Sequence, residues 1–336
     1  MATYVRTQEI EHEIGDRGRL ALRVTSPDVE MRAVDGGQAK VRITFEIRAA
    51  SDADADEILE RVRFGVSEGS GSLEVVEPRR GPDGIASLVR LFVGSGKVDA
   101  SVAVEAPRGC DLRFEGVSAD LTATGFRGEQ QYRTVSGDLV LDGTGGDLRV
   151  KGVSSDISLR ADAPLSSLEM NTVSGDISAV APRIGQLRVV TVSGDIEIET
   201  TLDDGPVHRV ETVSGDLSLG VAGDLSVEVR GISTDVDIRV PHRSEGSRDR
   251  RRYVIGSGGP TLTFSSMSGD VEVRAPRRGG AAPKPPTPPA PPSAPSMRVV
   301  LPDNDEQLAL LRALERGEID VDEAARRLAG GPASDV

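Results

Sequence analysis

The amino-acid sequence predicts a mainly β protein, a β-solenoid whose coils are each about 19 residues long. The first observation is a motif, Val-Ser-Gly-Asp followed by Leu or Ile, that returns many times along the chain. The second is an alternation of apolar and polar residues on both sides of that motif, which indicates strands with one buried face. The third is a shortage of aromatic rings, with six Phe, three Tyr and no Trp in 336 residues. A core built from Val, Leu and Ile instead favours β-structure.

The acidic residue of the motif sets the period of the repeat. Successive intervals are 18, 18, 20, 19, 21, 19 and 35 residues, so the last interval is close to two periods. Coils of this length are expected to stack with their strands in parallel, which places equivalent residues in columns about 4.8 Å apart. The residues that define the repeats are Asp120, Asp138, Asp156, Asp176, Asp195, Asp216, Asp235 and Asp270.

The register of each repeat predicts which residues face the core. With the Asp numbered zero, apolar residues recur at −8 and −6, again at −3, and then at +1 and +3. The change of parity at −3 indicates a corner, and we expect all five positions to point inward. Position −4 is always Gly, Thr or Ser, and Ser-Gly at −2 and −1 supplies the turn. Because Ala119, Ser155 and Thr234 replace this glycine, we expect it to serve tightness rather than a positive φ throughout.

Two regions flank or interrupt the regular coils of residues 107–276. Residues 1–106 contain alternating runs and one short helix, DADADEILERVRF, whose first turn is acidic. We expect them to form an irregular β-rich opening, or cap, of the same solenoid, since its end strands have an open edge to cover. Within the long last interval, PHRSEGSRDRRRYVIGSGGP predicts a surface loop that replaces or distorts one coil.

The C-terminal part predicts a linker followed by a helical hairpin. In the linker, 277–300, residues 281–296 hold eight prolines in 16 positions, and such a segment extends by about 3.1 Å per residue, roughly 50 Å in all. Residues 301–330 predict two amphipathic helices broken at Gly317, too short to bury their apolar face alone. We therefore expect the hairpin to bind a protein partner or a copy of itself, through Leu308, Leu311, Leu314 and Leu328.

Charge and composition exclude several classes of protein. A net charge of −14 argues against a nucleic-acid-binding protein. A lone cysteine, Cys110, forms no internal disulfide and no cysteine-rich zinc site. The first residues lack the apolar segment of a signal peptide, and nowhere do 18 apolar residues run together. We therefore expect a soluble cytoplasmic protein, and the sequence points to no catalytic residue, cofactor or metal ion.

The aligned Asp residues and His208 are candidate sites with a structural alternative. Eight carboxylates at one position could collect Ca²⁺, but a corner Asp is more often an acceptor for turn amides, and we favour that interpretation. His208 lies in the mostly aliphatic row at −8, so we expect a hydrogen-bonded core residue rather than a catalyst. Cys110 sits at a turn with no histidine near it in sequence, and we expect no nucleophilic role.

A cluster of arginines stands out in an acidic chain. One hypothesis is contact with an anionic surface, such as a membrane carrying acidic lipids. The alternative is a solvated loop without a ligand. The residues concerned are Arg243, Arg248, Arg250, Arg251 and Arg252.

The serial Val-Ser-Gly-Asp-Leu/Ile coils resemble the bacterial putative-adhesin family of β-strand repeat proteins, a domain of unknown function, over residues 15–275. The segment LRALERGEIDVDEAARRL resembles the short helical hairpins of the SHOCT type, which accompany such β domains in envelope-stress proteins of Gram-positive bacteria. These resemblances imply a β-solenoid, an interaction role and no catalytic residues. We therefore expect a non-enzymatic scaffold with a tethered partner-binding hairpin. The alternatives are a membrane-peripheral sensor that uses the arginine cluster, and a carbohydrate-binding or carbohydrate-active β-helix.

Overall fold

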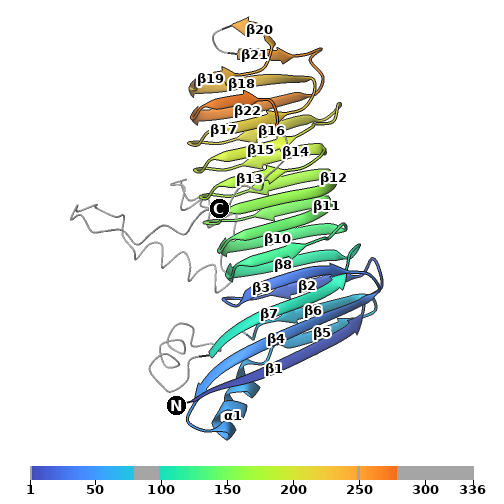
Figure 1. The fold of residues 1–336 in the computed structure, drawn as a ribbon. Helices are drawn as coiled ribbons and strands as arrows, with labels where there is room; N and C mark the ends of the chain where they lie inside the picture. The colour runs from blue at the N-terminus through green and yellow to red at the C-terminus, as the bar shows by residue number, and fades with distance from the viewer. Residues whose placement is uncertain (1, 79–97, 248–249, 278–336) are drawn as a thin grey trace, which may run out of the picture. The chain divides into compact units, whose positions relative to one another are not determined.

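The predicted β-solenoid is confirmed by a computed structural model, which describes residues 2–78, 98–247 and 250–277. These residues form 23 strands and one helix, and the β-structure belongs to the unit Met1–Pro276 (Figure 1). Each coil gives one strand to each of two parallel ladders, joined at the Val-Ser-Gly-Asp corner. The proline-rich linker and the predicted helical hairpin lie outside the described residues.

The first ladder contains the strands that precede the corner, and the second ladder contains those that follow it. In spatial order, the first ladder consists of β6 (Ser72–Val76), β2 (Arg19–Arg23), β8 (Asp111–Ser118), β10 (Glu129–Ser136), the later parts of β11 (Leu139–Lys151) and β12 (Ile157–Asn171), β14 (Ile184–Val190), β16 (Val207–Glu211), β22 (Thr261–Ser268) and β18 (Leu225–Ser233). The second consists of β7 (Val98–Pro107), β3 (Asp28–Val34), β9 (Leu121–Thr124), the earlier parts of β11 and β12, β13 (Ile177–Val180), β15 (Ile196–Thr200), β17 (Leu217–Val221), β23 (Val271–Arg274) and β19 (Val236–Ile238).

Antiparallel strands and the helix close the N-terminal end. Strand β4 (Gln38–Ala49) pairs antiparallel with β7 and with β1 (Ala2–Glu13), and β5 (Gly65–Gly69) pairs antiparallel with β6. Helix α1 (Asp52–Val62) begins where the Ser51 side chain accepts the Asp54 N–H at 3.2 Å, and its first turn is acidic as predicted. Arg6 on β1 bonds two carboxylates of α1, those of Asp52 and Asp56, each at 2.7 Å.

The order of the coils in space is exchanged at both ends of the stack. At the N-terminal end, the coil of β2 and β3 lies between the coil of β6 and β7 and the coil of β8 and β9. At the C-terminal end, β22 and β23 come last in the chain but lie between β16–β17 and β18–β19. The coil that comes last in the chain is therefore not outermost in space, and another coil is paired to each of its edges.

The long last interval of the repeat carries a β-hairpin, so the predicted surface loop is wrong. Strands β20 (His242–Ser247) and β21 (Arg250–Ile255) pair antiparallel, and β21 also pairs antiparallel with β18. The hairpin extends the first ladder past its last parallel strand and returns the chain to the inserted coil. The last two residues of RRRYVI, Val254 and Ile255, are both buried, and β21 pairs on one edge with β18 and on the other with β20, which explains why this basic segment forms a strand.

The core follows the predicted rows at −8, −6, +1 and +3, but the row at −3 points outward. Val117, Val213 and Met267 of that row are 42%, 43% and 57% exposed. The buried residue is instead at −4, where Thr134 and Thr191 are each 2% exposed. The first-ladder strand therefore keeps one parity as far as −4 and turns only afterwards.

A hydrogen bond explains how threonine occupies the inside of the corner. At −4 the Oγ1 atoms of Thr134, Thr172 and Thr191 each donate to the carbonyl oxygen two residues later, at 3.2 Å. The bond satisfies a buried hydroxyl group and fixes the turn, so this row tolerates a polar residue.

The motif glycine does adopt a positive φ in several coils, contrary to the expectation from sequence. In Gly194, φ is 128°, and a Cβ atom there would collide with the Gly175 carbonyl oxygen of the preceding coil. Gly137, Gly175 and Gly215 share this conformation. Close stacking of successive corners and the left-handed backbone both favour glycine at these positions.

Candidate functional site

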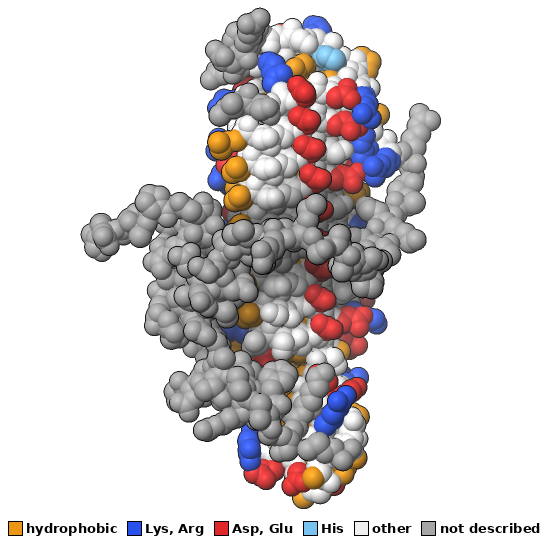
Figure 2. Space-filling model, turned by 90° about the vertical axis from the view of Figure 1, so that its left-hand side faces the viewer, with side chains coloured by type: hydrophobic (Ala, Val, Ile, Leu, Met, Phe, Trp, Pro, Cys, Tyr) orange, Lys and Arg blue, Asp and Glu red, His pale blue; other side chains and the backbone are white. Residues whose placement is uncertain are grey.

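The row at −3 forms an apolar column along the stack, exposed at its two ends and buried or half-buried between them. We call it the apolar column, and it consists of Val117, Val135, Val153, Val173, Val192, Val213 and Met267. Where grey atoms do not cover the face, Figure 2 shows a file of hydrophobic side chains and a file of acidic ones, with a band of other atoms between them. Val153 is buried, while the residues at the two ends of the column are the most exposed. Apolar side chains aligned in this way, rather than scattered singly, indicate a contact surface.

The motif Asp residues form the acidic column, parallel to the apolar one. In each pair of stacked coils an Asp Oδ1 atom accepts the backbone N–H of the neighbouring Asp, at 2.8–3.3 Å. The predicted structural role as an acceptor for corner amides is thus confirmed. The carboxylates are exposed, apart from the half-buried Asp156. The apolar column and the acidic column together are the corner face.

Hydrogen bonding explains why eight like charges can stand in one file. Two carboxylates about 4.8 Å apart in water repel each other by about 0.9 kcal/mol. A hydrogen bond to a charged acceptor contributes about 1.5–3 kcal/mol. The amide bond therefore outweighs the repulsion in each coil, and the corner face keeps a line of negative charge. This line favours cationic groups on whatever binds there.

The residues that the structure describes contain no group of three or more His, Cys, Asp or Glu side chains placed to hold a metal ion. In the acidic column the carboxylates lie in single file, one per coil, and each bonded Oδ1 serves a backbone amide. What the geometry offers is a charged edge rather than a coordination shell.

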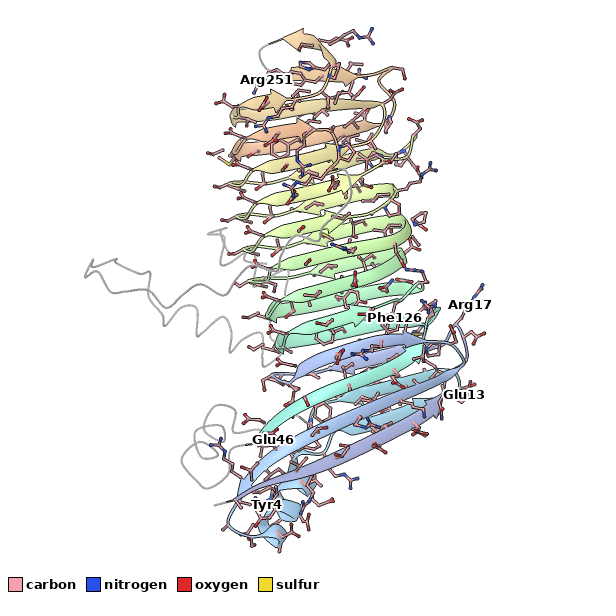
Figure 3. All side chains as sticks on the ribbon, in the orientation of Figure 1. Tyr4, Glu13, Arg17, Glu46, Phe126 and Arg251 are labelled. Carbon is pink, nitrogen blue, oxygen red and sulfur yellow. The ribbon has the colours of Figure 1, made fainter. Side chains whose placement is uncertain are left out.

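Two residues of the predicted arginine cluster, Arg251 and Arg252, bond to different parts of the chain. Arg251, labelled in Figure 3, donates to the Thr234 carbonyl oxygen at 2.6 Å, and Arg252 donates to Ser226 Oγ at 3.2 Å. Strand alternation places Arg252 and Arg251 on opposite faces of the hairpin, and Arg252 stands opposite Glu245. Arg243 is exposed. Arg248 lies outside the described residues, and Arg250 begins β21. Anionic-surface binding by these residues remains a prediction.

His208 is the hydrogen-bonded core residue that its row predicts. It is fully buried, its Nδ1 atom accepts the Leu187 N–H at 3.2 Å, and its Nε2 atom lies 2.9 Å from the Asp203 carbonyl oxygen. These partners fix the neutral tautomer with its proton on Nε2. Both ring nitrogens are occupied, which leaves neither for acid–base catalysis.

Cys110 is also a buried structural residue. Burial, followed by the nearby Asp111 charge, raises the pKa of its thiol to about 12. A thiol with such a pKa carries almost no thiolate near neutrality. The absence of a nucleophilic role expected from sequence agrees with this environment.

A shallow hollow of about 240 Å³ on the outer face of the N-terminal sheet was not predicted. Its charged rim alternates in sign, and Arg42 pairs with Glu9 at 2.9 Å while Lys40 pairs with Glu11 at 3.1 Å. Ala103, a small residue among long ones, leaves the space. Because the opposite charges neutralise one another within the sheet, the hollow offers little to attract a charged ligand.

The hairpin residues predicted to bind a partner, Leu308, Leu311, Leu314 and Leu328, lie outside the described residues. The sequence reasoning missed the apolar column, because it assigned the row at −3 to the core. The signal that could have revealed it is the invariably small residue at −4, which fits inside a corner where Val does not.

The stacked coils and their corner face define a β-solenoid of the repeat-protein class. The chain belongs to the Toastrack DUF4097 family, whose sequence profile matches residues 18–274. No curated protein matches the chain significantly. Among the described residues, no helix is long and apolar enough to cross a membrane.

Several solved structures are similar to the chain at low identity. A "putative adhesin" from Parabacteroides distasonis is 14% identical, with a TM-score of 0.37, and the match covers 80% of this chain and 97% of that one. A "putative adhesin" from Bacteroides fragilis is 11% identical, with a TM-score of 0.30 and the same coverage. A "putative cell adhesion protein" from Clostridium sporogenes is 8% identical, with a TM-score of 0.25, covering 80% and 100%.

Proposed function

We propose that this protein is a non-enzymatic scaffold that binds other proteins through its corner face. The observation that carries the proposal is the apolar column, which is exposed at both ends, at Val117 and at Val213 and Met267, and is flanked by a line of carboxylates. Protein interfaces combine an apolar centre with a polar rim, and this face has both. The candidate catalytic groups, His208 and Cys110, are buried and serve the core, which supports a role without chemistry.

The predicted helical hairpin of residues 301–330 is the second binding element of the proposal. Its leucine stripe is more apolar surface than a two-helix unit can hide, and the proline-rich linker separates it from the solenoid. A scaffold of this kind holds one partner on the solenoid and another on the tether. The envelope-stress setting, which the sequence resemblance implies, and the cytoplasmic location expected from the sequence belong to the same proposal.

Site-specific photo-crosslinking in the producing cells tests the corner face. A photoreactive amino acid replaces Val213 in the apolar column or, as a matched control, Val140 on the outer side of the second ladder. The two side chains are equally exposed, at 43% and 41%. We expect protein adducts at Val213 and few at Val140. Equal or absent crosslinking at both positions would exclude the corner face as the contact surface.

The hairpin is tested in the same cells with Leu311→Asp and Leu314→Asp together. Charges in the middle of the stripe should abolish the adducts of a crosslinker placed in the hairpin and leave those at Val213 unchanged. If the hairpin adducts persist in this variant, the leucine stripe is not the binding surface.

A further inference from the structure

We propose that the corner face binds the corner face of a second copy of this chain, so that two solenoids lie side by side and point in the same direction. This inference rests on the proposed function, because it names the partner of that surface. Three properties of the corner face support it: the spacing of its columns, the charges on either side of the apolar column, and its area.

The spacing of the apolar column matches another solenoid better than it matches a lone peptide. Equivalent side chains recur about every 4.8 Å along the stack. Side chains on one face of an extended strand recur about every 6.6–6.8 Å, and a helical turn advances about 5.4 Å. Either peptide would drift out of register within a few coils. A second solenoid has the same rise, so its column stays in register over the full length.

The charges beside the apolar column select the direction of the second copy. The acidic column lies on one side. The row at −5, which lies on the other side, has no net charge over the seven coils: its cations are Arg133 and Lys151, its acids are Glu115 and Glu211, and its other three residues are uncharged. When both copies point the same way, a two-fold axis runs along the stack. It places the acidic column of each copy opposite the −5 row of the other. In the opposite direction the acidic columns would face each other and repel.

The charge pairing between the two copies also joins equivalent coils. Arg133 belongs to the coil of Asp138, and Lys151 to the coil of Asp156, so each cation faces a carboxylate of the same coil in the second copy. The row also contains two acids, Glu115 and Glu211. Within their own chain Glu115 pairs with Arg23 at 3.0 Å and Glu211 with Arg209 at 3.5 Å. Internal pairing reduces their repulsion across the interface.

The size of the face predicts a weak, concentration-dependent dimer. Seven described coils span about 29 Å, and a strip about 20 Å wide along them covers roughly 600 Å² per copy. Stable interfaces bury about 800 Å² per partner. The dimer should therefore form at high concentration and dissociate on dilution.

Cysteine crosslinking of the purified full chain tests both the dimer and its direction. Cys110 is fully buried, so an introduced cysteine is the reactive one. We expect Val117→Cys and Val213→Cys each to form a disulfide dimer with its own counterpart, and Val140→Cys to form none. In a mixture of the two variants, we expect few disulfides between position 117 and position 213. Abundant 117–213 disulfides would show antiparallel pairing and overturn the proposed direction.

Analytical ultracentrifugation supplies the second measurement. The parent chain should dimerise as its concentration rises, Val213→Asp with Met267→Asp should remain monomeric, and Val140→Asp should behave as the parent. Unchanged melting temperatures show that the variants are folded. A parent chain that is monomeric at every concentration overturns the inference. If adducts to other proteins still form at Val213 in cells, the scaffold proposal stands without it.

Discussion

Asp270 Oδ1 accepts the backbone N–H of Asp235 at 2.9 Å, although Asp235 comes 35 residues earlier in the chain. In the rest of the acidic column the donor is the later residue, as where Asp216 N–H reaches Asp195 Oδ1 at 3.1 Å. The reversal marks the exchange of the last two coils. It shows that a hydrogen bond of the motif does not depend on which coil comes next in sequence.

Truncation at two positions distinguishes the solenoid from the tail. A chain that ends at Arg278 keeps every described strand, and its melting temperature should equal that of the full chain. A chain that ends at Pro260 loses β22 and β23, with the buried Leu262, Phe264 and Val271. Its melting temperature should fall by many degrees, because these strands support a coil on each side. A fall already present in the Arg278 truncation would mean that the tail stabilises the solenoid.

Substitution in the row at +1 should be far more costly than substitution in the row at +2. Ile196 is 1% exposed, so Ile196→Ala should lower the free energy of unfolding by about 2–5 kcal/mol. Glu197 points outward and pairs with Arg274 at 2.7 Å, so Glu197→Ala should cost no more than about 1 kcal/mol. Urea denaturation of the two variants measures the difference. Equal losses would be incompatible with the described register.

Replacing His208 by the aliphatic residue typical of its row should destabilise the protein. His208→Leu removes the acceptor of the Leu187 N–H and the donor to the Asp203 carbonyl oxygen. Leaving these buried groups unpaired costs about 1–3 kcal/mol each. Leu168→Met, a swap of similar volume in the same row, is the control and should cost less than about 1.5 kcal/mol. A His208→Leu chain as stable as the parent would show that these two hydrogen bonds contribute nothing.

The threonines at −4 should respond differently to loss of their hydroxyl groups. Thr191 Oγ1 donates to the Ser193 carbonyl oxygen, whereas Thr212 Oγ1 is buried and has no partner among the described residues. Thr191→Val should therefore cost about 1 kcal/mol, while Thr212→Val should be neutral or stabilising. Thermal unfolding of both variants gives the comparison. A larger loss for Thr212→Val would reveal a partner for that hydroxyl.

The thiol of Cys110 should be unreactive in the folded protein. Burial raises its pKa to about 12, and the thiolate is the reacting form. A chromogenic disulfide reagent at mildly alkaline pH should modify no thiol in the native chain and one thiol after denaturation. Rapid modification of the native chain would show that the core around Cys110 opens readily.

The coils could be predicted well because every repeat carries the same pattern of apolar residues. The row at +1 is apolar in every coil, and its members Ile157, Ile177 and Ile196 are buried in the structure. The prediction that the row at −3 faces the core is wrong for a physical reason. A valine outside the corner and a threonine inside it reverse the usual polarity, and a hydrogen bond that periodicity does not reveal makes the reversal possible.

The exchange of the end coils could not be predicted, because all coils carry the same register. Asp216 accepts the amide of Asp270, and nothing in the motif distinguishes that amide from the amide of Asp235. The directions of the arginine side chains could not be predicted for a different reason. Sequence proximity gathers Arg251 and Arg252, but a strand sends neighbouring side chains to opposite faces. For the corner face, the acidic column is predictable from the motif, whereas its apolar neighbour is not.

The inserted coil gives the C-terminal exit of the solenoid an unusual mechanical position. Arg277 follows β23, and β23 is paired on one side with β17 and on the other with β19. A pulling force on the C-terminal tail would act on β23, which is hydrogen-bonded along both of its edges. Its hydrogen bonds to β17 and to β19 would therefore have to break at the same time. In a stack with the last coil outermost, the same load would peel one edge bond after another. A chain that holds a tethered partner in this way would resist unfolding when a force pulls on its C-terminus.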